Sequence, residues 1–175
     1  MLDAAFALLQ RDDVPVLVDF PESIVDESDQ PLACVLPPRH DPSLHPAVDE
    51  ALGLRAAFER QRAVSGRTNV TRVGGPDKVA DLVGLFVSIV EGAEWDSVGL
   101  EPQQLGQAAL DIRDYYEEAA LALVEHTPAA RQAESWFYRS TATGKVLRQA
   151  QSIIREADAP RTAWFALVPA GQTPA

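Results

Sequence analysis

Two consecutive segments decide the predicted fold: residues 102–125, PQQLGQAALDIRDYYEEAALALVE, and residues 128–157, PAARQAESWFYRSTATGKVLRQAQSIIREA. In both segments apolar residues recur at the three- and four-residue spacing of an amphipathic helix. The turn between them contains a helix start, because Thr127 can cap a helix and Pro128 suits its first position. We therefore expect a helical hairpin.

The two predicted helices carry opposite charge. The first contains one cation, Arg113, and five carboxylates: Asp111, Asp114, Glu117, Glu118 and Glu125. The second contains two carboxylates and five cations: Arg131, Arg139, Lys145, Arg148 and Arg155. A local surplus of cations is notable in a chain whose formal charge is -11.

The helical period predicts where these charges point. At about 100° per residue, Asp111 and Asp114 fall opposite the apolar face of the first helix. Arg131, Tyr138 and Lys145 fall opposite the apolar face of the second helix by the same measure. We therefore expect both charged faces, and the Tyr138 side chain, to be exposed.

An exposed tyrosine among cations is typical of a protein interface. The predicted partner-binding residues lie on the second helix and are Arg131, Tyr138, Arg139, Lys145 and Arg148. The alternative is that both faces are merely solvated, in which case each exposed ion pair contributes only about 0–1 kcal/mol.

The rest of the chain predicts further helices and a few short strands. Helices are expected over residues 2–10, 47–64 and 76–90, the last with unbroken apolar spacing. Strands are expected near residues 14–20, 32–36 and 162–168, which are short apolar runs bounded by prolines or loops. Adjacent Tyr115 and Tyr116 are not expected both to face inward, since helical neighbours lie about 100° apart.

These elements predict an α+β fold, a bundle of about four helices with a small, mostly antiparallel sheet. The 175 residues suit a single domain covering 1–175, in which residues 21–46 form an irregular, proline-rich and acidic arm.

Composition limits the classes of function. A sequence pI near 4.6 argues against a nucleic-acid-binding role, which needs clustered cations. No apolar run is long enough to cross a membrane, and the N-terminus lacks the basic start of a signal peptide, so a cytoplasmic location is expected. The only cysteine, Cys34, cannot form an internal disulfide. The excess of arginine over lysine is typical of GC-rich bacterial genomes.

A glycine-bounded loop before the helix at 76–90 could bind an anion. Arg67, Arg72 and Lys78 surround two glycines and a helix N-terminus, the ingredients of a phosphate or carboxylate site. The alternative is an ordinary loop.

One carboxylate pattern resembles a known family. Glu91 and Glu94, followed after sixteen residues by Asp111 and Asp114, resemble the ExxE…ExxD pattern of MazG-type nucleoside triphosphate pyrophosphohydrolases, with aspartate in place of glutamate at position 111. The resemblance implies an all-helical enzyme that holds Mg²⁺ between two helices, since carboxylate oxygens suit that ion. The alternative is that all four carboxylates are solvated.

The sequence therefore favours a non-enzymatic interaction or adaptor domain, without a cofactor, that binds a protein partner or itself as a homodimer. The alternative is a nucleotide-binding protein or a Mg²⁺-dependent enzyme of the pyrophosphohydrolase kind.

Overall fold

The computed structural model describes residues 2–13, 17–19, 32–128 and 131–172, and within these ranges every regular element is a helix. The α-helices are α1 Leu2–Leu8, α2 Pro46–Gly53, α3 Arg55–Ser65, α4 Val79–Val90, α5 Pro102–Leu121, α6 Gln132–Ser140, α7 Ala142–Glu156 and α8 Arg161–Trp164. Two 3₁₀ turns, η2 Pro76–Lys78 and η3 Ala170–Gln172, complete the set. The predicted α+β class is therefore wrong, because the described residues contain no strand.

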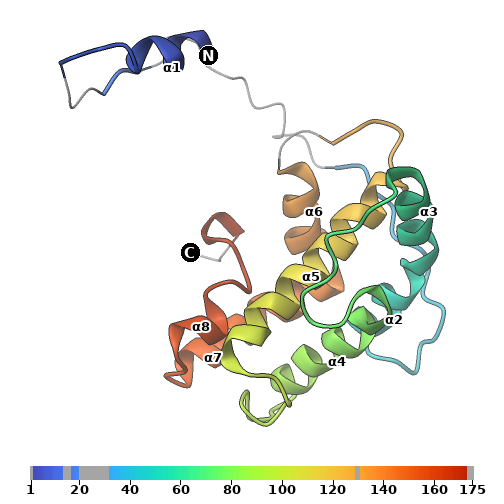
Figure 1. Ribbon diagram of the computed structural model, residues 1–175. Coiled ribbons are helices and arrows are strands. Elements are labelled where there is room, and N and C mark those ends of the chain that lie inside the picture. Colours follow the sequence, from blue (N-terminus) through green and yellow to red (C-terminus); the bar gives the residue numbers. More distant parts are fainter. Residues whose placement is uncertain (1, 14–16, 20–31, 129–130, 173–175) are drawn as a thin grey trace.

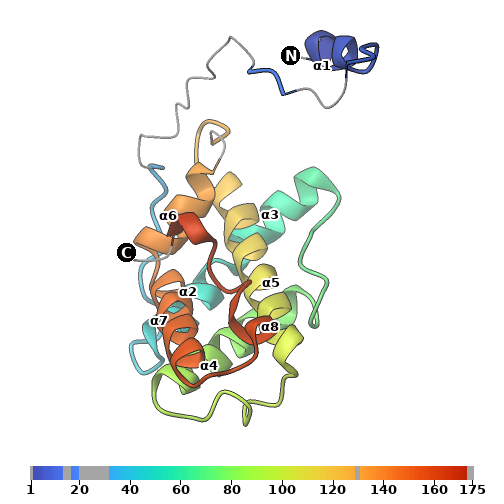
Figure 2. The same cartoon turned by 90° about the vertical axis from the view of Figure 1, so that its left-hand side faces the viewer.

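The long helix α5 lies at the centre of the bundle, with α3, α4, α6 and α8 packed around it (Figures 1 and 2). Because α5 has neighbours on several sides, Tyr115 and Tyr116 are both buried, and the expectation that one must face solvent is wrong. The Tyr115 ring stacks on Phe58 at 4.6 Å between ring centroids. Helix α7 packs against both α2 and α4 and so closes the core on the other side.

The apolar run at 162–168 forms the single turn of α8 followed by irregular chain, not a strand. Local backbone bonds and side chains take the place of a neighbouring strand. Gln151 Nε2 of α7 donates to the carbonyls of Trp164, at 3.1 Å, and Val168, at 3.3 Å. The run packs against α5, where Gly106 makes room for Ala166. A buried aromatic and β-branched segment can therefore be stable without pairing.

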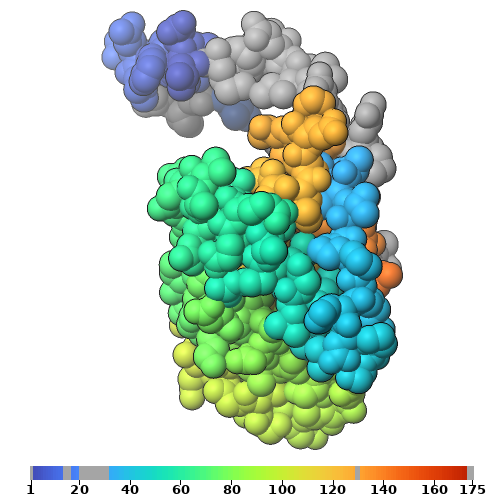
Figure 3. All heavy atoms as spheres, turned by 90° about the vertical axis from the view of Figure 1, so that its right-hand side faces the viewer, coloured from blue at the N-terminus to red at the C-terminus, as the bar shows by residue number. Residues whose placement is uncertain are grey.

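The other two predicted strands also fail. Residues 32–36 run along the body (Figure 3), with alternate side chains half-buried. The Trp136 indole Nε1 donates to the Cys34 carbonyl at 3.2 Å, but no second strand among the described residues pairs with this segment. Of the predicted strand 14–20, residues 14–16 and 20 lie outside the described residues, and 17–19 form no regular element. Residues 21–31 of the predicted arm at 21–46 likewise lie outside them.

Two of the predicted long helices are each broken into two. The segment 47–64 divides into α2 and α3 at the buried Leu54, and the segment 128–157 divides into α6 and α7 at Thr141. Thr141 has extended backbone, with φ -99° and ψ 152°, and its hydroxyl accepts from Gly144 N at 2.9 Å as an N-cap. Two other helix predictions are confirmed in outline. The segment 76–90 forms η2 and α4, and the first helix of the hairpin forms α5, which ends at Leu121.

A half-buried glutamate joins α2, α5 and α7. Glu50 accepts backbone N–H bonds from Ala142, at 3.0 Å, and Thr143, at 3.2 Å, in the first turn of α7. The Tyr116 hydroxyl donates to the same carboxylate at 3.0 Å. A carboxylate at a helix N-terminus satisfies donors that lack partners inside the helix and opposes the helix dipole.

A second carboxylate from α2 holds the chain that precedes it. Asp49 is buried and accepts from the backbone N–H of His40, at 3.1 Å, and Asp41, at 2.9 Å, while Arg39 Nε donates to it at 3.3 Å. Its bond from the Asp41 amide is the main reason that its pKa lies below the usual value, despite the opposing effect of burial. The segment before α2 is thereby fixed to the bundle.

Candidate functional site

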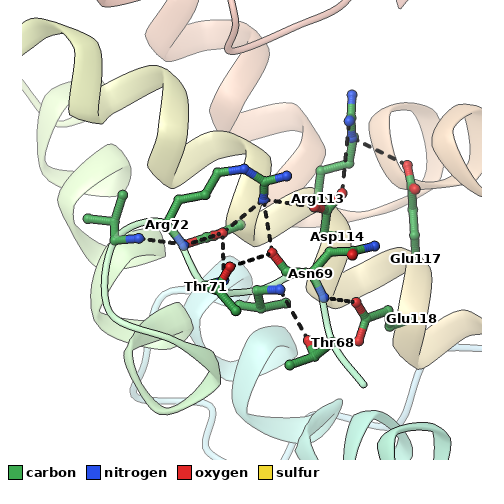
Figure 4. Close-up of polar contacts among 11 residues, drawn as sticks. Thr68, Asn69, Thr71, Arg72, Arg113, Asp114, Glu117 and Glu118 are labelled. Carbon is green, nitrogen blue, oxygen red and sulfur yellow. Dashed lines mark hydrogen bonds and ion pairs between the residues drawn. The ribbon is translucent and has the colours of Figure 1, made fainter. Parts of the chain in front are cut away.

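The structure brings several of the charged residues singled out in the sequence together in three places: under the loop before α4, in a pocket beside α5 and α6, and in a groove between α4 and α7. The first of these is centred on Asp111, whose side chain has no exposed surface. Its carboxylate accepts backbone N–H bonds from three consecutive loop residues, Thr71 at 3.2 Å, Arg72 at 2.9 Å and Val73 at 2.8 Å (Figure 4). The carboxylate therefore fixes the loop over α5.

The Arg72 side chain closes this cluster. Its Nη1 lies 3.0 Å from Asp111 Oδ1 and 2.8 Å from Asp114 Oδ2, and it also donates to the Asn69 carbonyl (Figure 4). Partial burial works against the charged guanidinium, but the bonds to Asp114 and Asp111 outweigh it and raise the pKa of Arg72. The Nη1 atom of Arg72 is therefore already bonded to groups of this chain.

The prediction that Asp111 and Asp114 face solvent is wrong. Asp114 is only 9% exposed, because the loop residues 68–73 cover the face of α5 that the helical period marks as polar. Polar residues opposite the apolar face were expected to meet water, and here they meet backbone amides and a guanidinium. Burial of a carboxylate is tolerated when such donors surround it.

The four carboxylates of the pyrophosphohydrolase pattern do not come together as a metal site. Glu91 and Glu94 are exposed beyond the end of α4, whereas Asp111 and Asp114 are paired with Arg72. Over the described ranges, no group of three or more His, Cys, Asp or Glu residues is arranged to hold a metal ion.

The predicted anion residues also separate. Arg67 is exposed in the loop after α3, and Lys78 points to solvent in an ion pair with Asp81 at 3.2 Å. Only Arg72 is partly enclosed, and its ligands are Asp111 and Asp114 of this chain. The loop is thus held by its own protein, as an ordinary structural loop would be.

The second place is an acidic pocket of about 400 Å³ beside α5 and α6. It is lined by Asn69, Arg113, Asp114, Glu117, Glu118, Leu121, Thr127, Pro128, Arg131, Ala133 and Glu134. Arg113 lies among the carboxylates, 3.5 Å from both Glu117 and Glu134. Burial raises the pKa of Glu117 to about 7, opposed by Arg113 and reinforced by Asp114 and Glu134. This pocket already contains its own counter-ion.

Of the predicted partner-binding residues, Tyr138 is placed wrongly. It is 1% exposed, and its hydroxyl donates to the Leu167 carbonyl at 2.8 Å. The break at Thr141 explains the error, because the angular position taken from α7 does not carry over to α6 once the helix is interrupted. Arg139 is exposed and donates to Gln172 at 3.3 Å, and Arg131 lines the acidic pocket.

The third place is a basic groove, defined by Val90, Lys145, Arg148, Gln149, Ser152 and Ile153, with a volume of about 590 Å³. It brings together two of the predicted partner-binding residues, Lys145 and Arg148, three positions apart on α7. Neither forms an ion pair with any carboxylate among the described residues, in contrast to Arg72 and Arg113. The Arg148 Nε atom is buried and has no hydrogen-bond partner.

The apolar part of this groove was not predicted. Val90 ends α4, and Ile153, which is 37% exposed, lies two turns after Lys145. The helical spacing of Lys145, Gln149, Ser152 and Ile153 was visible in the sequence, but the neighbouring end of α4 follows only from tertiary packing. The groove therefore combines cations with one exposed aliphatic side chain, Ile153, and one half-buried aliphatic side chain, Val90.

Comparisons with protein-family models, with curated proteins and with solved structures found no match for this chain.

Proposed function

We propose that this chain is a non-enzymatic protein-interaction domain whose basic groove binds an acidic, amphipathic helix of a protein partner. The observation that carries the proposal is a groove in which Lys145 and Arg148 have no carboxylate partner among the described residues and lie beside the exposed Ile153. Carboxylates of a partner would pair with these two cations.

The chemistry of the groove defines this partner. Guanidinium and ammonium groups bind carboxylates through charge-assisted hydrogen bonds, so acidic side chains fit Lys145 and Arg148. The aliphatic side chains of Val90 and Ile153 fit apolar residues on the same ligand. An amphipathic helix presents both kinds of side chain along one face and commonly binds in a groove.

The charge of the whole protein supports the choice of site. A chain of net charge -11 repels an acidic ligand over most of its surface, whereas the basic groove attracts it locally. Electrostatic complementarity of this kind orients a partner and speeds its association. The second surface expected from the sequence, on α5, is not part of the proposal, because Asp111 and Asp114 are buried.

The proposed setting is the cytoplasm. None of the helices in the described ranges is long and apolar enough to cross a membrane. A single cysteine, Cys34, suits a compartment in which thiols stay reduced.

Fluorescence anisotropy with designed helical peptides tests the proposal. One labelled peptide carries glutamates beside a leucine stripe, and its matched control carries lysines in their place. We expect only the acidic peptide to bind, with an affinity that falls as salt screens the exposed charges. Lys145→Glu should weaken binding about tenfold, the change that about 1.4 kcal/mol produces.

Arg60→Glu is the matched control, because Arg60 is an exposed helical cation on α3, away from the groove. The proposal fails if both peptides bind equally or if Lys145→Glu and Arg60→Glu have the same effect.

The nucleotide-binding alternative is tested on the same sample by thermal shift with ATP, with and without Mg²⁺. A ligand at 100 times its Kd adds about 2.7 kcal/mol of stability, so binding would be evident. We expect no shift, and a shift that disappears in Arg72→Gln would favour the alternative instead.

A further inference from the structure

The helix α1 presents an apolar stripe to solvent. Leu2 and Phe6 lie four residues apart in α1, and Leu9 follows directly after the helix ends at Leu8. Their exposed fractions are 72%, 61% and 80%. No residue of α1 is buried. Figures 1 and 2 show α1 apart from the helical bundle.

Such a helix needs a surface to pack against. Seven residues form fewer than two turns, and isolated helices shorter than about 12–15 residues are marginal in water. Three large apolar side chains at helical spacing are the usual anchors of a helix that binds in a groove. α1 therefore has the features of a docking segment.

The charges of the α1 segment complement those of the basic groove. Residues 2–13 contain Asp3, Asp12 and Asp13 against one cation, Arg11, which is already paired with Asp13. The groove contains Lys145 and Arg148 and no carboxylate. The aliphatic residues of the groove, Val90 and Ile153, suit the apolar stripe of α1. The chain thus contains a segment of the kind that its own groove is proposed to bind.

We infer that α1 of one copy docks in the basic groove of a second copy. This inference rests on the proposed function and identifies the helix that the groove binds. When each copy places its α1 in the groove of the other, both grooves are filled by the same symmetric contact, and the dimer is closed. Two linked contacts also strengthen each other through effective concentration.

The position of the groove favours a second copy over the same one. The N-terminal part of the chain joins the bundle beside α6, where Trp136 binds the Cys34 carbonyl. The groove extends away from this point along α7, from Lys145 in the first turn to Ile153, and reaches the last residue of α4, Val90 (Figures 1 and 2).

The first experiment compares the oligomeric state of full-length variants by sedimentation velocity over a dilution series. We expect the wild type to dimerise and the triple variant Leu2→Ser, Phe6→Ser, Leu9→Ser to be monomeric at the same concentrations. Val64→Ser is the control, because Val64 is 84% exposed on α3 and lies outside both partners of the proposed contact. The inference is overturned by a monomeric wild type, or by a triple variant that dimerises as the wild type does.

The second experiment swaps the charges. Lys145→Glu should raise the dissociation constant of the dimer about tenfold or more, the change that about 1.4 kcal/mol corresponds to. Adding Asp3→Lys and Asp12→Lys to Lys145→Glu should restore part of the loss. A dimer whose dissociation constant is insensitive to Lys145→Glu would contradict the contact.

A labelled peptide of residues 2–13, added to the full-length triple variant, separates this inference from the proposed function. We expect the peptide to bind and Lys145→Glu to weaken its binding. If the designed acidic peptide binds but the 2–13 peptide does not, the identity of the helix is wrong and the proposed function stands. If neither binds, both are wrong. If the 2–13 peptide binds while the wild type stays monomeric, α1 docks within one copy and the claim of exchange is overturned.

Discussion

Removing the negative charge of Asp111 should destabilise the protein more than removing that of an exposed aspartate. In Asp111→Asn the side chain keeps its size, but an amide group meets three backbone N–H donors and the Arg72 guanidinium in place of a carboxylate. The Asp111 carboxylate contacts these donors and not solvent, because its side chain has no exposed surface.

The magnitude follows from the lost partners. Hydrogen bonds to a charged group contribute about 1.5–3 kcal/mol each, and a buried donor left unpaired costs about 1–3 kcal/mol. Removing one partner of a buried ion pair costs about 3–5 kcal/mol. These contributions are not additive, because Arg72 keeps Asp114 and the loop can open partly to water. We therefore expect Asp111→Asn to lower the free energy of unfolding by about 2–4 kcal/mol, and Asp111→Ala by about 3–5 kcal/mol.

Urea unfolding followed by circular dichroism measures this difference as a shift of the midpoint at unchanged slope. Asp81→Asn is the matched control: Asp81 pairs with Lys78, but both side chains are more than half exposed, so its loss should cost only about 0–1 kcal/mol. Amide exchange adds a local readout, since protection of Thr71, Arg72 and Val73 should fall in Asp111→Asn. If Asp111→Asn and Asp81→Asn destabilise equally, the carboxylate does not fix the loop and the reasoning is refuted.

Two further predictions concern the packing of α7 and the charge of the acidic pocket. A Cβ on Gly144 would lie 2.1 Å from the Phe137 carbonyl oxygen and 2.7 Å from Tyr138 Cα, so Gly144→Ala should destabilise by at least about 1–3 kcal/mol. Gly84→Ala is the control, because no atom lies within 4 Å of the added Cβ at this helical position, and it should stabilise the protein by about 0.5–1 kcal/mol. If Gly144→Ala and Gly84→Ala change the free energy of unfolding in urea equally, this account is contradicted. Because the pKa of Glu117 is raised to about 7 in the folded protein, the folded state binds more protons than the unfolded state between the ordinary glutamate value and pH 7. The contribution of Glu117 to the free energy of unfolding should therefore increase as pH falls from 8 to 5.5, by at most about 2 kcal/mol. Glu117→Gln should remove this part of the pH dependence. An identical pH profile in the variant would count against a raised pKa of Glu117.

The reliable predictions from sequence came where the periodic pattern and the burial agreed. In α4, apolar residues at helical spacing form the buried face, so the pattern alone predicts the helix. The pattern failed at Thr141, because a single residue with extended backbone resets the direction of every later side chain. The buried Tyr138 follows from that break, which could be suspected from a threonine that caps the amide of Gly144 three residues later.

Two other failures have a different cause, in that a buried group found an unexpected partner. The aromatic run before Pro169 resembled a strand because of its residue types, yet Gln151 satisfies two of its carbonyls from α7. Asp111 resembled a solvated residue because it lies opposite the apolar face, yet a loop some 38 to 40 positions away in sequence supplies its donors. Residue propensity and hydrophobic period describe one segment at a time, so neither identifies a hydrogen-bond partner that lies in a distant segment. Of the candidate groove, Lys145 and Arg148 were predicted, and Val90 was not.

The bonds of Glu50 also bear on how the chain is completed during synthesis. Glu50 in α2 leaves the ribosome long before its two amide partners, which lie 92 and 93 positions later at the start of α7. Until residues 142–143 emerge, the Glu50 carboxylate lacks these two amide donors, and α2 and α4 lack the helix that packs against both of them. We therefore expect α2 to take its final position only after the start of α7 has left the ribosome.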